Sequence, residues 1–160
     1  MPIQEGENIP AVGLMEMVDG SPTPLQSTDL GAGRKIVVFA VPGAFTPTCS
    51  AKHLPGFVAQ AAALRAKGVE DIICVSVNDA FVMHAWGEAQ NVGADVRMVA
   101  DGNGDFAREL GLEMDGTKFG MGHRSQRFAM ILNDNRVEKL LVESGPGLSA
   151  SSAESILENL

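Results

Sequence analysis

The chain has 160 residues, of which 45% are hydrophobic and 20% are charged. These proportions are typical of a globular protein, so we expect one domain over residues 1–160 and exclude a disordered chain. Twenty acidic against twelve basic residues give a net charge of -8, which opposes binding to phosphate backbones and anionic bilayers. We therefore expect neither a nucleic-acid partner nor a membrane partner.

Residues 1–7 contain neither the basic region nor the apolar core of a targeting peptide, so the default expectation is a cytoplasmic location. The chain has two cysteines, Cys49 and Cys74, which are too few for a disulfide framework. In a reducing compartment, two cysteines indicate redox chemistry rather than crosslinking.

The first part of the chain contains two predicted strands. Residues 11–18 predict the first strand, the glycine and prolines of residues 20–24 predict a turn region, and Ser27 is placed to cap a short helical turn. Residues 35–41 form an apolar run with β-branched members, which is typical of a strand buried on both faces.

A turn and a helix follow this buried strand. Pro42 and Gly43 end the strand, and Thr46 followed by Pro47 predicts a helix N-terminus with proline at the first helical position. Cys49 then falls near the third helical position, where free N–H groups and the helix dipole favour a thiolate. The local sequence leaves two interpretations open, a reactive nucleophile and a small buried hydrophobe.

The rest of the chain alternates between strand and helix. We expect the helix of Cys49 to run to about Lys67, to end at Gly68 and to be kinked by Pro55. The further expected elements are a strand over 71–77, a helix over 80–90 capped by Asp79, a strand over 96–100, a helix over 105–110, a glycine-rich loop over 113–122, a hairpin of 126–132 with 136–142, and a helix over 152–160.

This order of elements indicates an α/β fold, with a mixed central sheet flanked by helices. Periodicity alone does not distinguish among the topologies of that class. Cys49 and His53 are spaced to face one ion, but no C-x-x-C or H-x-x-x-H pattern supplies further ligands, so we expect no metal site.

Several motifs resemble those of a known family. Pro42-x-x-x-Thr46-x-x-Cys49 matches the active-site motif of the peroxiredoxins, and residues 41–57 as a whole resemble the type II group that includes peroxiredoxin-5. Further matches are spread over nearly the whole chain, at Ser76-Val77-Asn78-Asp79, Phe81, Trp86, Asp101-Gly102-Asn103-Gly104 and Arg124-Ser125-x-Arg127-Phe128.

The resemblance implies a thioredoxin-like fold and a thiol peroxidase that needs no cofactor. Cys49 would attack hydrogen peroxide or an alkyl hydroperoxide and become a sulfenic acid. Pro42 would shield the thiolate from water and Thr46 would orient the peroxide. Arg127 matches the active-site arginine of the family, and a permanent cation there would favour the thiolate.

Other residues are weaker candidates for the substrate pocket. A protonated His53, one turn past Cys49, would favour the thiolate, although packing at the pocket edge is an equal alternative. Gly43 and Phe45 belong to the same motif, but Phe45 also suits a core or subunit contact, as do Phe119 and Trp86. Arg124 flanks the site, and His84 and His123 are assigned to the surface and a loop.

Cys74 has two interpretations, a buried inert thiol within an apolar strand and a resolving cysteine, as discussed for some plant type II peroxiredoxins. A strand-centre cysteine reaches a helix-start cysteine only by local unfolding, because a disulfide needs Cα atoms within about 7 Å. The peroxiredoxin-5 branch has its resolving cysteine in a stretch resembling 147–151, which contains no cysteine here.

This departure favours a one-cysteine cycle, in which glutathione with glutaredoxin, or thioredoxin, reduces the sulfenic acid. The family resemblance also implies a homodimer. Two other classes of function stay open at this point: a thiol-disulfide oxidoreductase, which the absence of C-x-x-C disfavours, and a non-catalytic binding or chaperone protein with an unreactive Cys49.

Overall fold

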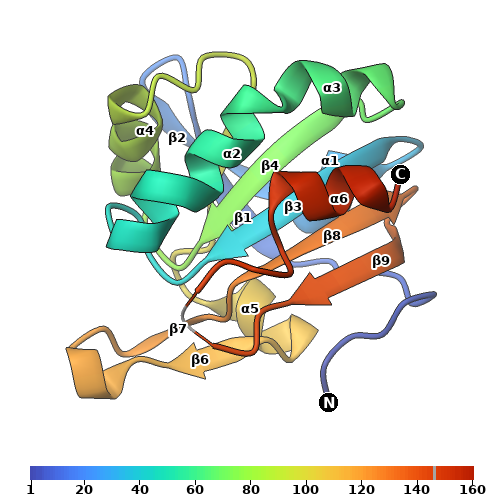
Figure 1. Ribbon diagram of the computed structural model, residues 1–160. Helices are drawn as coiled ribbons and strands as arrows, with labels where there is room; N and C mark the ends of the chain where they lie inside the picture. Colours follow the sequence, from blue (N-terminus) through green and yellow to red (C-terminus); the bar gives the residue numbers. More distant parts are fainter. Residues whose placement is uncertain (146) are drawn as a thin grey trace.

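The computed structural model describes residues 1–145 and 147–160. Its centre is a mixed sheet of seven strands in the order β2-β1-β5-β4-β3-β8-β9 (Figure 1). The strands of this sheet are β1 (Gly13–Val18), β2 (Ser21–Gln26), β3 (Lys35–Val41), β4 (Asp71–Ser76), β5 (Arg97–Ala100), β8 (Phe128–Asn133) and β9 (Arg136–Val142).

Helices cover both faces of the sheet, and the predicted mixed α/β architecture is confirmed. One apolar cluster contains residues of four helices, α2 (Leu54–Ala59), α3 (Ala61–Ala66), α4 (Ala80–Ala89) and α6 (Ala153–Glu158). The other contains residues of α1 (Ser27–Gly31) and α5 (Asp105–Leu110). Successive residues of β3 alternate between the two clusters, as expected for a strand covered on both sides.

The strongest sequence patterns produced the expected elements. β3 has the predicted bounds, and it pairs in parallel with β4 and antiparallel with β8. β8 and β9 form the predicted hairpin, in which Asp134 and Asn135 adopt positive φ angles of 51° and 66°. Both residue types tolerate that conformation, which a tight hairpin turn requires.

The predicted turn over residues 20–24 is only partly right, because the turn is confined to Asp19 and Gly20 and residues 21–24 belong to strand β2. Pro22 and Pro24 are tolerated there because β2 is the edge of the sheet, where a missing N–H on the open side leaves no partner unsatisfied. Ser27 does not act as a cap either. Its hydroxyl donates to the Pro10 carbonyl at 2.6 Å and accepts from the Val12 N–H at 2.9 Å.

The predicted loop over 113–122 is also partly wrong. It contains strand β6 (Glu113–Asp115), which pairs with β7 (His123–Ser125), and the short 3-10 helix η2 (Thr117–Phe119) lies between them. Strands of three residues are too short to show a period in the sequence, so only the pairing partner reveals them.

The single helix expected from Cys49 to Lys67 is divided into three parts. A π-helical turn, η1 (Cys49–His53), comes first, and the Leu54 N–H donates to the Cys49 carbonyl five residues back. Pro55 has no N–H to continue a regular ladder, so an interruption at this place is the expected consequence. α2 and α3 follow, separated by Gln60.

No helix in the described part of the chain combines the length and the apolar character that crossing a bilayer requires.

One stability prediction concerns the start of α4, where the Asp79 carboxylate accepts from the Val82 N–H at 2.8 Å. Replacing a capping aspartate by alanine costs about 1 kcal/mol. We expect Asp79→Ala to lower the free energy of unfolding in urea by about that amount, and Asp79→Asn to lower it less because the amide oxygen can still accept. Equal losses in the two variants would contradict the capping role.

Candidate active site

Cys49 lies in the first turn of the helical segment that follows β3. Pro47 is the first helical residue and Cys49 the third, as predicted, and the Ser50 N–H donates to the Thr46 carbonyl at 2.9 Å. The Cys49 side chain is 0% exposed and belongs to the apolar cluster on this face of the sheet. The sulfur is therefore surrounded by protein rather than by water.

Arg127 is brought to this sulfur by the pairing of β3 with β8. The register places Ala40 opposite Phe128, so the next position along the two chains sets Arg127 beside the end of β3. The Nη2 of Arg127 donates to Cys49 Sγ at 3.1 Å, and the side chain is buried. A buried cation in contact with the sulfur stabilises its anionic form.

His53 is the second partner of Arg127. Its Nδ1 is 2.9 Å from Arg127 Nη1, and its Nε2 is 2.8 Å from the Ser151 carbonyl oxygen. A guanidinium only donates and a carbonyl only accepts, so Nε2 carries the hydrogen and Nδ1 accepts. The imidazole in this arrangement is neutral.

Of the two alternatives for His53, the protonated imidazole is therefore wrong, and the ring packs against Phe39 and Phe57. Burial lowers the pKa of His53 to about 4, the hydrogen bond to Ser151 opposes that shift, and the charge of Arg127 adds to it. His53 therefore does not place a positive charge near Cys49. Its Nδ1 instead accepts from Arg127, whose guanidinium contacts the sulfur.

Glu143 holds the segment that carries the Ser151 carbonyl. Five groups of residues 149–151 donate to its carboxylate: three backbone N–H groups and the hydroxyls of Ser149 and Ser151. Burial alone would raise the pKa of Glu143, but the hydrogen bonds from Ser151 and Ser149 lower it to about 2. Sequence analysis missed Glu143, whose only signal is an acidic residue at the end of a strand, ahead of a serine-rich stretch.

The loop between β3 and the helix is fixed from β4. The Ala44 N–H donates to Asn78 Oδ1 at 3.0 Å, and the Ser76 hydroxyl donates to the same oxygen at 2.6 Å. The Thr46 hydroxyl donates to the Gly43 carbonyl at 2.7 Å rather than capping the helix. The hydroxyl hydrogen is therefore used in the bond to Gly43, and the two lone pairs of the Thr46 oxygen are left to accept hydrogen bonds.

The other residues singled out by sequence lie around this centre. Arg124 Nη1 donates to the Pro42 carbonyl at 3.4 Å, so Arg124 flanks the loop. Trp86 is buried and donates from Nε1 to the Ser50 hydroxyl at 3.0 Å. Phe45 and Phe119 are 55% and 76% exposed, so they do not belong to the core, and the alternative of a subunit contact stays a prediction.

Cys74 is a free thiol at the centre of β4, opposite Phe39 in the neighbouring strand β3. It is 0% exposed, and burial raises its pKa well above the ordinary value, with a smaller contribution from Cys49. A thiol held neutral in an apolar strand is unreactive. The structure thus matches the inert interpretation of Cys74.

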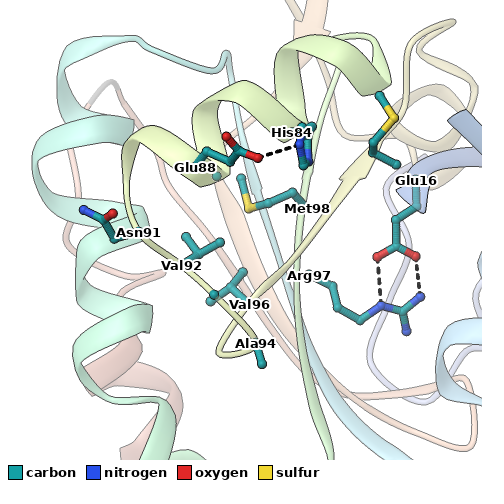
Figure 2. Close-up of a pocket in the computed structure, with 12 residues that line it drawn as sticks. Glu16, His84, Glu88, Asn91, Val92, Ala94, Val96, Arg97 and Met98 are labelled. Atoms are coloured by element: carbon teal, nitrogen blue, oxygen red, sulfur yellow. Dashed lines mark hydrogen bonds and ion pairs between the residues drawn. The ribbon is translucent and has the colours of Figure 1, made fainter. Parts of the chain in front are cut away.

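The described residues contain no cluster of three or more His, Cys, Asp or Glu side chains arranged to hold a metal ion. An open pocket of about 630 Å³ between α4 and β5 shares no residue with the Cys49 site. Figure 2 shows that its charged walls pair among themselves, Arg97 with Glu16 and His84 with Glu88. No cysteine is among its lining residues.

Comparisons with known proteins agree with this geometry. A family model described as Redoxin matches residues 4–157. Peroxiredoxin-2B of Arabidopsis thaliana is 53% identical over 131 residues, which cover 82% of this chain and 81% of that protein. The chloroplastic peroxiredoxin-2E-2 of Oryza sativa subsp. japonica is 49% identical over 163 residues, covering 99% of this chain and 72% of that protein.

A solved structure extends the agreement to three dimensions. Reduced Prx3 of Vibrio vulnificus in complex with H₂O₂ superimposes with a TM-score of 0.94 at 49% identity, covering 98% of both chains. The fold is therefore the thioredoxin-like fold of the peroxiredoxins, as the sequence motifs implied.

The expected cytoplasmic location is contradicted. The rice relative and peroxiredoxin-2E of Arabidopsis thaliana are both named as chloroplastic proteins. These two relatives therefore argue against the cytoplasm as the default location.

A redoxin match across almost the whole length, together with relatives at these identities, shows that the chain belongs to the peroxiredoxin family, in its type II group, and is a thiol-dependent peroxidase.

Proposed function

We propose that Cys49 is the peroxidatic nucleophile and that the enzyme uses a one-cysteine cycle through a sulfenic acid. The observation that carries this proposal is the contact of 3.1 Å between Arg127 Nη2 and Cys49 Sγ within the protein interior. It supplies a buried sulfur with the positive charge that a thiolate needs.

In the proposed reaction the thiolate of Cys49 attacks one oxygen of hydrogen peroxide or an alkyl hydroperoxide. The O–O bond breaks, a Cys49 sulfenic acid forms, and the leaving oxygen takes a proton and departs as water or an alcohol. The Nε of Arg127 is buried and has no hydrogen-bond partner in the described residues, so it is free to donate to a peroxide oxygen.

Thr46 and Pro42 act on the same substrate. The Thr46 hydroxyl gives its hydrogen to Gly43, so its lone pairs can accept from the O–H of the peroxide. Pro42 is partly exposed and shields the sulfur from bulk water. Because Cys49 is 0% exposed and a peroxide is larger than water, a small outward movement of the loop 42–48 admits the substrate.

The second half of the cycle requires a thiol from outside the chain. Cys74 is buried and held neutral, and residues 147–151 contain no cysteine and are tied to Glu143. An external thiol therefore attacks the sulfenic acid, releasing water and forming a mixed disulfide that a further thiol reduces. Glutathione with glutaredoxin, or thioredoxin, fills this role.

We also propose that residues 1–160 act as one catalytic domain and that two copies associate into a homodimer. Exposed phenylalanines support the second statement: Phe45 lies in the active-site loop, and Phe119 lies in the hairpin that Arg124 connects to Pro42. Burial of large apolar side chains is the main driving force for association between subunits.

The test of the cycle compares the two cysteines. We expect Cys49→Ser to abolish peroxide consumption with glutathione and glutaredoxin and with thioredoxin, while Cys74→Ser keeps most of the turnover with the better of the two donors. Peroxide consumption that survives in Cys49→Ser would refute the assignment of the nucleophile. Collapse of turnover in a folded Cys74→Ser would refute the one-cysteine cycle.

A second prediction concerns Arg127. Lysine cannot contact Cys49, His53 and a peroxide at once, because it lacks the planar fork of donors. We expect Arg127→Lys to slow the oxidation of Cys49 by about a hundredfold, the usual cost of losing a donor to a developing charge. Arg108→Lys, at an exposed surface pair, is the matched control and should keep the wild-type rate.

A third prediction follows from the neutral His53. Its pKa is about 4 in the folded protein against 6.5 in the unfolded chain, so unfolding takes up a proton between these values. The contribution of His53 to the free energy of unfolding is therefore fully present above pH 6.5. It is lost as the pH falls towards 4, and the loss is about 3 kcal/mol in all. Urea titrations across this window should show a shallower pH dependence for His53→Gln, and an identical slope in both proteins would count against a buried neutral imidazole.

A further inference from the structure

The guanidinium of Arg127 is held by a closed circuit of hydrogen bonds. On one side, the Glu143 N–H donates to the Arg127 carbonyl at 2.9 Å. On the other, the Glu143 carboxylate binds Ser151, the Ser151 carbonyl accepts from His53, and His53 accepts from Arg127 Nη1. Glu143 therefore contacts the main chain of Arg127 directly and is linked to the guanidinium of Arg127 through Ser151 and His53.

The orientation of His53 depends on where the Ser151 carbonyl lies. Only while that carbonyl accepts from Nε2 is Nδ1 left bare to face Arg127, because a neutral imidazole has one donor and one acceptor. Without this acceptor, the imidazole can turn or change tautomer and present an N–H to the guanidinium. Two donors facing each other would push Arg127 away from Cys49.

The Ser151 carbonyl in turn depends on Glu143. The bond from the Ser151 N–H to Oε2 is 2.6 Å long, which is short for an N–H donor and is typical of an ionised acceptor, and the bond from the Ser151 hydroxyl to the same oxygen is 2.7 Å long. Ser149 donates its hydroxyl to the other oxygen, Oε1, at 3.0 Å. Five donors converge on this carboxylate, so an amide, with one oxygen and two N–H donors of its own, cannot replace it.

We propose that Glu143 is a positioning residue of the peroxidase, which aims Arg127 at Cys49 by holding the Ser151 carbonyl against His53. The proposal rests on the function proposed above, in which Arg127 stabilises the Cys49 thiolate. A purely structural alternative also exists, because the segment 147–152 leads into α6, which packs on α2 and β8 (Figure 1).

The test uses Glu143→Gln, which has the size of the native side chain but not its charge. The rate of Cys49 oxidation by hydrogen peroxide can be followed by the fluorescence of Trp86, the one tryptophan of the chain. Its Nε1 donates a hydrogen bond to the hydroxyl of Ser50, the residue after Cys49. We expect Glu143→Gln to slow this oxidation at least tenfold. We also expect the acid limb of its pH–rate profile to move to higher pH, because Arg127 no longer favours the thiolate.

The other titratable groups around the sulfur do not account for the acid limb of this pH–rate profile. The pKa of His53 lies at about 4 because the ring is buried, and burial raises the pKa of Cys74 well above its ordinary value. A merely structural loss would reduce the stability and the amount of active enzyme but would leave the position of the acid limb unchanged. A second readout independent of turnover is the tautomer of His53, from the ¹⁵N chemical shifts of its ring, which should change in Glu143→Gln.

A matched pair of serine variants tests the same idea without removing the charge. Ser151→Ala and Ser149→Ala each delete one hydroxyl that donates to Glu143, from opposite oxygens of the carboxylate. Only Ser151 carries the carbonyl that holds His53. We expect Ser151→Ala to slow oxidation several-fold and Ser149→Ala to stay within twofold of the wild type, so the pair decides the question even if Glu143→Gln does not fold.

The outcomes separate this proposal from the one on which it rests. A folded Glu143→Gln with the wild-type rate and acid limb, or equal effects of the two serine variants, would overturn the positioning role. If Arg127→Lys is slow while Glu143→Gln is not, only the role of Glu143 fails. If Arg127→Lys oxidises at the wild-type rate, the thiolate role of Arg127 and the positioning role of Glu143 fail together.

Discussion

The contact between the guanidinium of Arg127 and the sulfur of Cys49 is the interaction on which the rest of the site depends. Both groups are almost completely buried, and an unpaired charge in such surroundings costs several kcal/mol. A negatively charged sulfur at this position would need the guanidinium as its partner. His53 accordingly stays neutral, and the negative charge of Glu143 is satisfied by five hydrogen-bond donors rather than by a second cation.

The sheet makes this contact possible by bringing segments that are distant in sequence to one end of its strands. The parallel strands β3 and β4 end together, so the loop after β3 leads to Cys49 while Asn78, just beyond β4, holds that loop. The antiparallel strand β8 starts at the same end of the sheet, and Arg127 directly precedes it. Glu143 follows the end of β9, the next strand along. Four strands thus place their functional residues at one end of the sheet, without any of those residues being neighbours in sequence.

The two cysteines show how far the surroundings decide reactivity. Cys49 and Cys74 are both 0% exposed, and both belong to the same apolar cluster. Cys74 lies within a strand, where burial keeps its thiol protonated, whereas Cys49 lies at the start of a helix and receives a hydrogen bond from Arg127. Because only a thiolate is a strong nucleophile, these surroundings favour reactivity at Cys49 and disfavour it at Cys74.

Local patterns in the sequence determined the strand β3, the helix start at Pro47, the third helical position of Cys49 and the β8–β9 hairpin, since each depends on residues only a few positions apart. The motif of Pro42, Thr46 and Cys49 also led to the correct family. Tertiary structure alone decided that the prolines of β2 lie in an edge strand, that His53 is neutral and that Glu143 binds residues 149–151. Edge position, burial and hydrogen-bond partners depend on contacts between segments that are far apart in the chain, such as the hydrogen bonds that link residues 53, 127, 143 and 151. A local period or spacing in the sequence does not indicate such contacts.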